Sequence, residues 1–403
     1  MEYVEDKYTN VKNVTSVGVD CCGCGNCANT CSMDAISMKP DNEGFLTPSI
    51  RLDDCINCGA CLKACPQTKP VETLHKQKAF AAVTHDAEIL SKASSGGAFG
   101  TIAKYILTKE HSYVCAASFV NGEVRHIITQ NYDDIRKCQG SKYVQSDVTD
   151  CIPRLKEILK DANNIVLFCG TPCQVNALYS FLHKHPENLY TLDLVCHGVP
   201  SPKFLASDLS HYCKDVASLK DIRFRWRNPK KQKSGSGFFL SVVKPQSSRL
   251  YSSNFDPYFA SFMRGESFRE SCYKCHYANL NRVGDITIGD FDSASKYQIF
   301  HPGESKSTVI VNTKHGSALW YEVMKLFDYI AIDLNVEAAF NHQLSEPFKR
   351  SSIRDDVYAD AFSLSFSQMR KKYSVQVTYQ QHVLAFIQTY MPVVYKLLLE
   401  KFL

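Results

Sequence analysis

Two stretches of the chain repeat one cysteine spacing, C-x2-C-x2-C-x3-C, and the second of them is followed by Pro66. Three thiolates at three-residue steps can hold one face of a cubane iron–sulfur cluster. The fourth thiolate begins a helix that points away, so it reaches the other cluster. We therefore expect two 4Fe-4S clusters, the first held by Cys21, Cys24, Cys27 and Cys65 and the second by Cys55, Cys58, Cys61 and Cys31.

Zinc is the alternative occupant of these thiolates, because it also binds cysteine. Zinc ribbons, however, use two CxxC pairs rather than two runs of four cysteines. Gly25 and Gly59 lie at matching positions of the two runs, where a side chain would crowd the sulfur atoms. Ser32 departs from the pattern, in which proline is usual at that position. Cys22 is left over, and we expect it to be a small loop residue rather than a ligand.

Four cysteines in the remainder of the chain could hold a third cluster. Cys173 and Cys196 each follow a predicted strand, at 165–168 and 192–195. The carboxyl ends of parallel strands are where α/β sheets bind their ligands, so these two thiols would face one crevice. A CxxC pair, Cys272 and Cys275, could supply the other two ligands. Spacing alone leaves two alternatives open, namely buried small residues and a separate zinc or redox pair.

Two further motifs could bind anions. Ser94-Ser95-Gly96-Gly97 precedes a predicted helix over 98–109, and free N–H groups at a helix start attract phosphate. The alternative is a flexible entry to that helix. The second motif is a predicted strand, 222–227, in which Arg223, Arg225 and Arg227 share one face. It suits a cofactor phosphate or an acidic redox partner, and otherwise it is a solvated, charged edge strand.

The composition limits what kind of protein can carry these motifs. The chain has 403 residues, which corresponds to roughly two to three domains, and 44% of them are apolar. Its net charge of +5 is weak for a nucleic-acid binder, so no nucleic acid is expected as a partner. The amino-terminal residues show no apolar signal segment, and no uninterrupted run of about 18 apolar residues predicts a transmembrane helix. We expect a cytoplasmic protein in a reducing compartment, where thiols stay available as ligands.

Three regions must position the motifs. Residues 1–75 are predicted to form a small α+β module of the two-cluster ferredoxin type. Residues 76–345 alternate strands and helices, which predicts an α/β domain with a parallel or mixed sheet, divided into parts of about 76–155 and 156–345. The pair of strands 113–120 and 124–129 flanks Asn-Gly, a strong hairpin signal.

Residues 346–403 are predicted to be a helical C-terminal segment. An apolar stripe runs from Leu384 to Phe402 at spacings of three to four residues. We interpret it as a helical cap on the main domain, and the alternative is an amphipathic helix on a membrane or partner.

Several ordered motifs over residues 78–345 resemble the coenzyme F-420 hydrogenase/dehydrogenase beta-subunit family: SSGGAFGTIAKYIL (94–107), GSKYVQS (140–146), LFCGTPCQV (167–175), LVCHGVPSP (194–202) and CYKCHYANLNRVGDITIGDF (272–291). The resemblance implies a flavoprotein that binds FAD. It also implies a third 4Fe-4S cluster on Cys173, Cys196, Cys272 and Cys275. Its candidate flavin-site residues are Ser95, Gly96, Gly97, Lys142, Tyr143 and Thr171. Asp292-Ser293 stands where many relatives have a tryptophan-glycine step, so the electron acceptor can differ from F-420.

The resemblance implies an FAD- and iron–sulfur-dependent oxidoreductase. Its flavin would exchange an electron pair with a small two-electron substrate, such as the deazaflavin F-420, and single electrons with the clusters. Its protein partner would be a ferredoxin or a larger oxidoreductase subunit. The alternatives are a non-catalytic electron-transfer subunit, a reductase serving surface-polysaccharide biosynthesis, and a zinc-bearing scaffold. No catalytic side chain is identified, and His197 is expected to be structural rather than a proton carrier.

Overall fold

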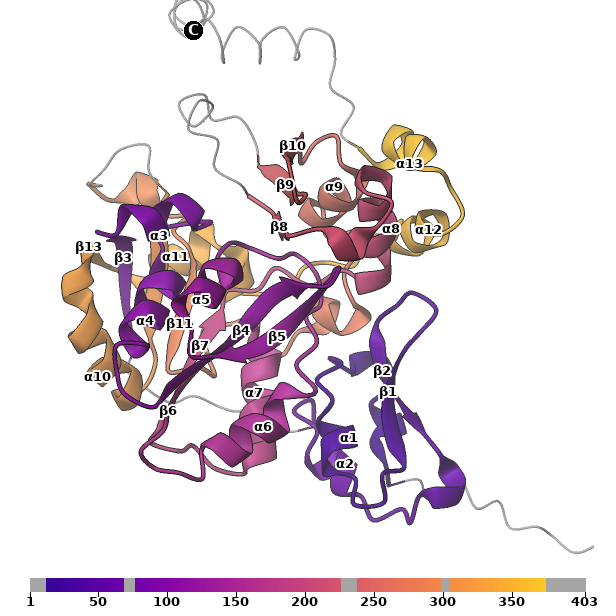
Figure 1. The fold of residues 1–403 in the computed structure, drawn as a ribbon, viewed down its shortest axis with the longest axis horizontal. Coiled ribbons are helices and arrows are strands. Elements are labelled where there is room, and N and C mark those ends of the chain that lie inside the picture. Colours follow the sequence, from indigo (N-terminus) through magenta and orange to yellow (C-terminus); the bar gives the residue numbers. More distant parts are fainter. Residues whose placement is uncertain (1–11, 69–76, 226–237, 299–304, 375–403) are drawn as a thin grey trace, which may run out of the picture.

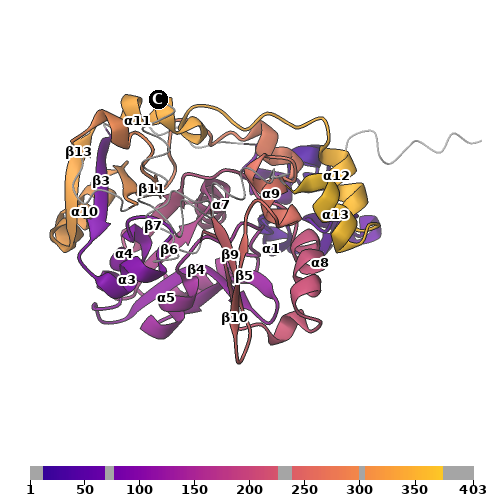
Figure 2. The same cartoon turned by 90° about the horizontal axis from the view of Figure 1, so that it is seen from above.

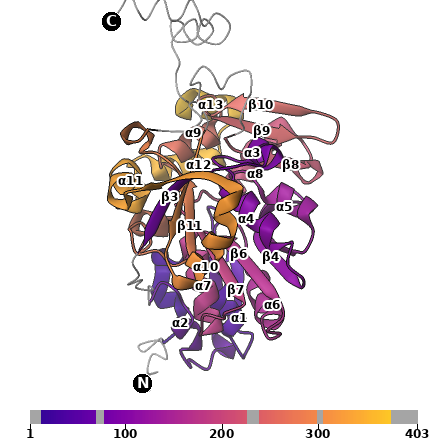
Figure 3. The ribbon, with the colours of Figure 1, turned by 90° about the vertical axis from the view of Figure 1, so that its left-hand side faces the viewer.

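The computed structural model describes residues 12–68, 77–225, 238–298 and 305–374 (Figure 1). The amino-terminal part forms a small body that lies beside α6 and α7 of the main domain in Figures 1 and 3. No helix among the described residues is long and apolar enough to cross a membrane.

In the small amino-terminal body, each of the two cysteine runs contains a short helix that begins at a glycine. Its elements are η1 (Val14–Asp20), α1 (Asn26–Thr30), β1 (Ile36–Pro40), β2 (Leu46–Ile50), η2 (Leu52–Asp54) and α2 (Ala60–Lys63). β1 and β2 pair as an antiparallel hairpin. Gly25 and Gly59 cap the starts of α1 and α2 with φ of +79° and +74°, a left-handed conformation that favours glycine. The predicted small α+β body is confirmed.

Within the described ranges, eight strands form the main sheet in the order β13-β3-β12-β11-β7-β6-β4-β5. Neighbours among β4, β6, β7 and β11 pair in parallel, and the other pairs are antiparallel. The predicted mixed α/β sheet is therefore confirmed. The strands are β3 (Lys78–Thr84), β4 (Ser112–Val120), β5 (Glu123–Thr129), β6 (Ile165–Gly170), β7 (Leu189–Leu194), β11 (Ile286–Asp290), β12 (Ser307–Val311) and β13 (Phe327–Ile332).

The predicted hairpin is confirmed as β4 and β5. Asn121 and Gly122 connect the two strands with φ of +51° and +87°. Two consecutive positive φ values match the twist of the flanking strands, which explains why Asn-Gly occupies this turn.

Helices cover both faces of the main sheet, as buried parallel strands require. Along β4, Val114 and Ala116 face the apolar cluster that includes α4, α5 and α10, whereas Cys115 faces the cluster of α6 and α7. The bounds are α3 (Ala87–Lys92), α4 (Ala98–Ile106), α5 (Tyr132–Cys138), α6 (Cys151–Ile158), α7 (Pro172–Leu182), α10 (Lys314–Val323) and α11 (Leu334–Phe340), with short turns η6 (Ala294–Lys296), η7 (Met324–Leu326) and η8 (His342–Leu344).

A second layer stands beside the main sheet (Figure 2). A three-stranded antiparallel sheet of the described chain, in the order β10-β9-β8, shares an aromatic core with α8, α9, α12 and α13. Its bounds are α8 (Pro202–Tyr212), η3 (Val216–Ser218), β8 (Asp221–Arg223), β9 (Phe239–Val243), β10 (Ser248–Ser252), α9 (Pro257–Met263), η5 (Glu270–Lys274), α12 (Arg354–Ala361) and α13 (Phe366–Tyr373).

Two sequence predictions fall on this layer. Val357, Tyr358 and Met369 are buried in its core, so the first part of the C-terminal segment does pack as a helical cap. The stripe from Leu384 to Phe402 lies outside the described residues. The predicted strand 222–227 is wrong in length: β8 ends at Arg223, because Arg225 adopts a left-handed φ of +58°. Arg227 lies outside the described residues.

Candidate redox-cofactor sites

A cavity at the outer end of the small body is lined by cysteines of both runs. Its lining consists of Cys31, Cys55, Cys58 and Cys61, together with Asn13, Ser32, Met33, Ile36, Ile56, Asn57, Gly59 and Ala60. Cys31 follows α1, Cys55 follows η2, and Cys61 lies in α2. The four sulfur-bearing side chains expected for the second cluster thus surround one space, and their chemistry fits a 4Fe-4S cluster.

The thiols expected for the first cluster lie deeper. Burial, together with the neighbouring thiols of Cys21 and Cys65, raises the pKa of Cys27 to about 12. Burial also raises the pKa of Cys65 to about 11, with Cys22 and Cys21 as neighbours. Such thiols hold their protons until a metal displaces them.

Cys24 differs from the other ligands expected for the first cluster. It is buried in an apolar cluster with main-domain residues, and its thiol interacts with that of Cys22. Among the described residues no cysteines are joined by a disulfide, and no three His, Cys, Asp or Glu side chains are arranged to hold a single metal ion. A 4Fe-4S cluster distributes its four ligands over four iron atoms, so it needs no such convergence on one point.

The four main-domain cysteines meet at the carboxyl edge of the main sheet. Cys173 and Cys196 follow β6 and β7, which are adjacent and parallel. Burial and the nearby Cys275 thiol raise the pKa of Cys196 to about 11. The pKa of the Cys272 thiol is raised by burial and then by Cys196 and Cys275. Three segments distant in the sequence therefore bring their thiols into one group.

Cys22 joins this group from the small body. The neighbouring thiols of Cys173 and Cys24 hold the pKa of Cys22 well below its usual range, and Cys22 in turn raises the pKa of each of those two thiols. The expectation of a plain loop residue did not anticipate these contacts, because the sequence separates Cys22 from its main-domain neighbours by about 150 residues.

The turn 94–97 lies at the same edge of the sheet, beside β3. The N–H of Thr84 donates to the carbonyl of Gly96 (2.8 Å), and the Ser95 and Ser307 hydroxyls are 3.0 Å apart. A Cβ on Gly96 would lie 2.0 Å from the Ala82 carbonyl oxygen, so only glycine fits. Gly97 then starts α4 with φ of +84°. Close packing against β3 and β12 is thus one physical reason for the two glycines.

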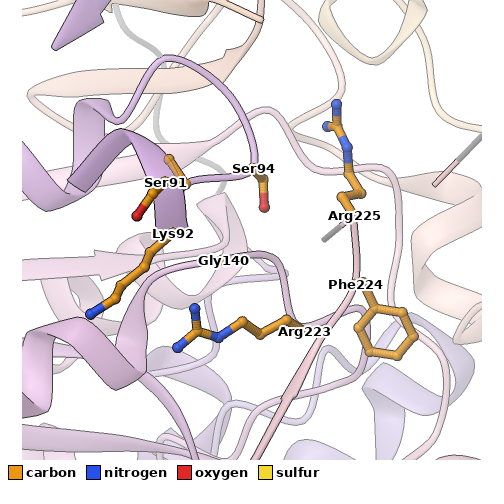
Figure 4. A pocket seen from close by; sticks show the side chains of 8 residues that line it. Ser91, Lys92, Ser94, Gly140, Arg223, Phe224 and Arg225 are labelled. Carbon is orange, nitrogen blue, oxygen red and sulfur yellow. The ribbon is translucent and has the colours of Figure 1, made fainter. Parts of the chain in front are cut away.

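A pocket unites the two anion-binding motifs predicted from the sequence. Figure 4 shows Ser94 of the turn facing Gly140 and the strand segment that carries Arg223, Phe224 and Arg225. The other lining residues are Ser91, Lys92 and Ala93.

Neither Arg223 nor Arg225 is a solvent-exposed charge on an edge strand. Arg223 Nε donates to Asp221 (2.6 Å), and Arg225 pairs with Asp290 at the carboxyl end of β11. Their side chains are only 14% and 12% exposed. The Nε of Arg225 is buried and has no acceptor in the described part of the chain.

The remaining flavin-site candidates differ in position. The Lys142 ammonium donates to the carbonyls of Lys137, Gln139 and Gly140 at 2.9, 3.1 and 3.5 Å, which caps the end of α5. Thr171 caps α7 through a reciprocal pair of hydrogen bonds with Gln174. Tyr143 interacts with Arg225, and its ring stacks on Phe262 with 4.1 Å between centroids. Tyr143 and Lys142 thus lie near arginines of the pocket, Tyr143 near Arg225 and Lys142 near Arg223.

A buried carboxylate supports the loop after β11. Glu337, fully buried, accepts hydrogen bonds from the N–H groups of Asp292 and Ser293 at 3.1 Å each, and from the hydroxyls of Ser293 and Thr308 at 2.6 and 3.0 Å. Burial, with Asp290 and Glu337 nearby, raises the pKa of Asp292 to about 6. The sequence carries no local signal for Glu337, because it lies 44 residues beyond Ser293.

His197 packs among three phenylalanines, and its ring lies 4.9 Å from that of Phe348. Burial lowers the pKa of this imidazole, so it is neutral near pH 7. An aromatic cage around a neutral ring agrees with the expected structural role.

Comparison with known proteins gives a consistent picture. Residues 164–332 match the sequence model for the carboxyl-terminal part of the coenzyme F420 hydrogenase/dehydrogenase beta subunit, and residues 79–152 match the model for its amino-terminal part. Together the two models match more than half of the chain. Residues 20–69 match a 4Fe-4S dicluster domain.

One curated relative is the coenzyme F420-dependent sulfite reductase of Methanocaldococcus jannaschii, 22% identical over 315 residues. The match covers 74% of this chain but 45% of that relative, so the chain spans about half its length. A chain of the F420-reducing [NiFe] hydrogenase complex from Methanosarcina barkeri, solved as a xenon derivative, is 18% identical with a TM-score of 0.44. That comparison covers 76% of this chain and 92% of the other.

Proposed function

The chain belongs to the coenzyme F420 hydrogenase/dehydrogenase beta-subunit family and carries a 4Fe-4S dicluster domain, and from this we propose an FAD-dependent iron–sulfur oxidoreductase. It passes electrons between its clusters and a small two-electron substrate such as F-420. The observation that carries the proposal is the order of groups along one edge of the main sheet.

That edge supports a continuous electron path. Along it lie the turn 94–97 beside β3, then Asp290 at the end of β11, then Cys196 after β7 and Cys173 after β6. Neighbouring strands are about 4.8 Å apart, so the path from β3 to β6 spans roughly 19 Å. The small body adjoins its last member, where Cys22 contacts Cys173. Asp290, which pairs with Arg225 of the pocket, and Cys196 follow the neighbouring strands β11 and β7. A flavin at the pocket and a cluster on Cys196 would therefore be close enough for single-electron transfer.

The pocket of Ser94, Arg223 and Arg225 supports binding of the FAD phosphates. The buried Arg225 Nε lacks an acceptor among the described residues, and guanidinium groups bind phosphate through paired N–H donors. Tyr143 and Asp290 hold that arginine in place, and Lys142 fixes the Gly140 turn that forms the opposite wall. Bound FAD would supply hydride exchange with the substrate, while these residues would bind and orient it.

The clusters are assigned to twelve cysteines in this proposal. The small body holds two, and Cys173, Cys196, Cys272 and Cys275 hold the third. Cys24, Cys27, Cys61 and Cys65 are buried, whereas Cys58 is exposed. The potentials of the clusters would therefore differ with the exposure of each site and with the hydrogen bonds to its sulfur atoms.

A second function is favoured by the matched family models, which describe the beta subunit of a hydrogenase/dehydrogenase. The protein would then be a non-catalytic electron-transfer subunit for a larger oxidoreductase. It would keep the clusters and lack a flavin, so flavin content separates the two proposals. A reductase serving surface-polysaccharide biosynthesis is a variant of the first proposal with another substrate.

The test is anaerobic purification of the full chain, followed by iron, zinc and flavin quantification. The proposal requires about twelve irons and one FAD per chain. Arg225→Gln should lose FAD and keep iron, whereas the control Arg125→Gln, at an exposed position of β5, should keep both. Iron without flavin would favour the electron-transfer alternative, and zinc would overturn both proposals.

A further inference from the structure

A buried arginine of the main domain reaches the loop of the first cluster. Arg269, just before the Cys272 pair, is only 4% exposed, and its Nε donates to the carbonyl of Cys21 (2.5 Å). Its two terminal nitrogens donate to the Leu46 carbonyl and to Gln145 Oε1, at 2.9 Å each. One guanidinium thus joins the cysteine loop and the β1–β2 hairpin of the small body to a buried side chain of the main domain.

The positive charge of Arg269 has no carboxylate partner within the described ranges, because all three of its side-chain acceptors are neutral. The two nearest acids along the chain, Glu266 and Glu270, pair with other arginines. The ring of Phe45, itself buried, lies 5.3 Å from the guanidinium carbon and shields it from water. Burying a charge without a counter-charge is costly, so a compensating negative group is expected beside this side chain.

The turn that carries the Cys21 sulfur lies against Arg269. The N–H of Gly23 donates to Cys21 Sγ (3.3 Å). A Cβ on Gly23 would lie 2.9 Å from a terminal nitrogen of Arg269. The guanidinium therefore contacts this turn at two points, the Cys21 carbonyl and Gly23. A 4Fe-4S cluster bound through Cys21 would bring the net negative charge of its thiolates to the same place.

We propose that Arg269 is a positioning residue that supplies the buried counter-charge of the first cluster and thereby raises its reduction potential. Reduction makes the cluster more negative, and a positive charge in a low dielectric stabilises the more negative state more strongly. Holding the loop in place would not by itself require a charge, because neutral donors can serve neutral acceptors. This inference rests on the ligands that the proposed function assigns to the first cluster.

The test is a potentiometric titration of the anaerobically purified full chain, followed by EPR. Cys21→Ser identifies the signal of the first cluster as the one that disappears together with about four irons. Arg269→Gln removes the charge and keeps an amide donor. In this variant the equilibrium constant for reduction of that cluster should fall at least tenfold, a shift of about 59 mV to more negative potential. Arg269→Lys keeps the charge and should retain most of the wild-type potential.

Gln145→Glu tests the charge while the arginine stays in place. Its carboxylate would occupy the acceptor position 2.9 Å from Arg269 and compensate the guanidinium, so the potential should again become more negative. This variant decides the question if Arg269→Gln does not fold. Arg264→Gln is the matched control, because the charge it removes is already paired with Glu266 at 2.7 Å, and all cluster potentials should stay unchanged.

Three results would overturn the inference. Unchanged potentials in Arg269→Gln and Gln145→Glu, or equal shifts in Arg269→Gln and Arg269→Lys, would leave Arg269 as a mechanical clamp. Full retention of iron in Cys21→Ser would remove the ligand assignment of the proposed function, and this inference with it. The iron content of Cys21→Ser thus distinguishes the failure of the proposed function from the failure of this inference alone.

Discussion

The fourth cysteine of each run is expected to bind the cluster held mainly by the other run. Pairs of substitutions can test this assignment. Cys31 belongs to the first run, yet it lines the same cavity as Cys55, Cys58 and Cys61. If these four hold one cluster, Cys31→Ser and Cys58→Ser remove the same four irons. A fully loaded chain holds about twelve irons, so each single variant should retain about eight.

The double variants give the decisive numbers. Cys31→Ser with Cys58→Ser should still retain about eight irons, because both changes destroy one cluster. Cys65→Ser with Cys58→Ser should retain about four, because Cys65 is assigned to the first cluster, among the buried thiols around Cys27. Iron is measured colorimetrically on anaerobically reconstituted protein, and the EPR spectrum of the reduced state identifies the missing species.

Cys213→Ser serves as the matched control, since its half-buried thiol donates to the Asp215 carbonyl (3.2 Å), remote from every expected cluster. It should retain about twelve irons. The reasoning is refuted if the Cys31 and Cys58 changes together lower iron to about four while the Cys65 and Cys58 changes leave about eight. Each run would then hold its own cluster. Far-UV circular dichroism of every variant separates cluster loss from unfolding.

Four other substitutions, one of them a control, probe the fold, the junction and the flavin pocket. Burial beside Asp256 holds the pKa of Asp208 well above its usual range, so the folded chain keeps a proton that the unfolded chain releases above about pH 4. The free energy of unfolding should therefore fall by about 1.4 kcal/mol per pH unit as the pH rises toward the pKa of Asp208 in the folded chain. Urea titrations at several pH values should show that the free energy of unfolding of Asp208→Asn depends less steeply on pH than that of the wild type. Equal slopes in the two proteins would contradict this. Gly25→Ala, at φ +79° against Thr149, should lower the free energy of unfolding by about 2–3 kcal/mol. The matched control Gly59→Ala, at φ +74° with only ordinary contacts around it, should cost about 1 kcal/mol, and similar losses in thermal melts would show that the junction contact contributes nothing. Lys142→Met removes the ammonium that caps α5 and should reduce FAD retention in gel filtration while iron stays constant, and a variant that keeps its flavin would separate this cap from the pocket.

The cysteine-rich body was predictable because its determinants are local. Ligands three residues apart are placed by the same loop, and glycines such as Gly25 and Gly59 are required by the turn they occupy. The Asn121-Gly122 hairpin and the strands before Cys173 and Cys196 follow likewise from short-range backbone preferences. The family resemblance rested on several such motifs in order, and the comparisons confirm it.

Tertiary structure decided which of these motifs meet. The main sheet places β3 next to β12 and β11 next to β7, although neither pair is consecutive in the chain. That strand order brings the turn 94–97, Asp290 and Cys196 to one edge. Arg225 reaches the pocket lined by Ser94 through another contact, the bridge between Ser141 and Phe224. The contact of Cys22 with Cys173 depends in turn on buried side chains of Gln145 and Arg269, which belong to separate segments. Long-range packing leaves no periodic trace in the sequence, because each contact is specified jointly by residues of separate segments, such as Arg225 with Asp290 or Gln145 with Arg269.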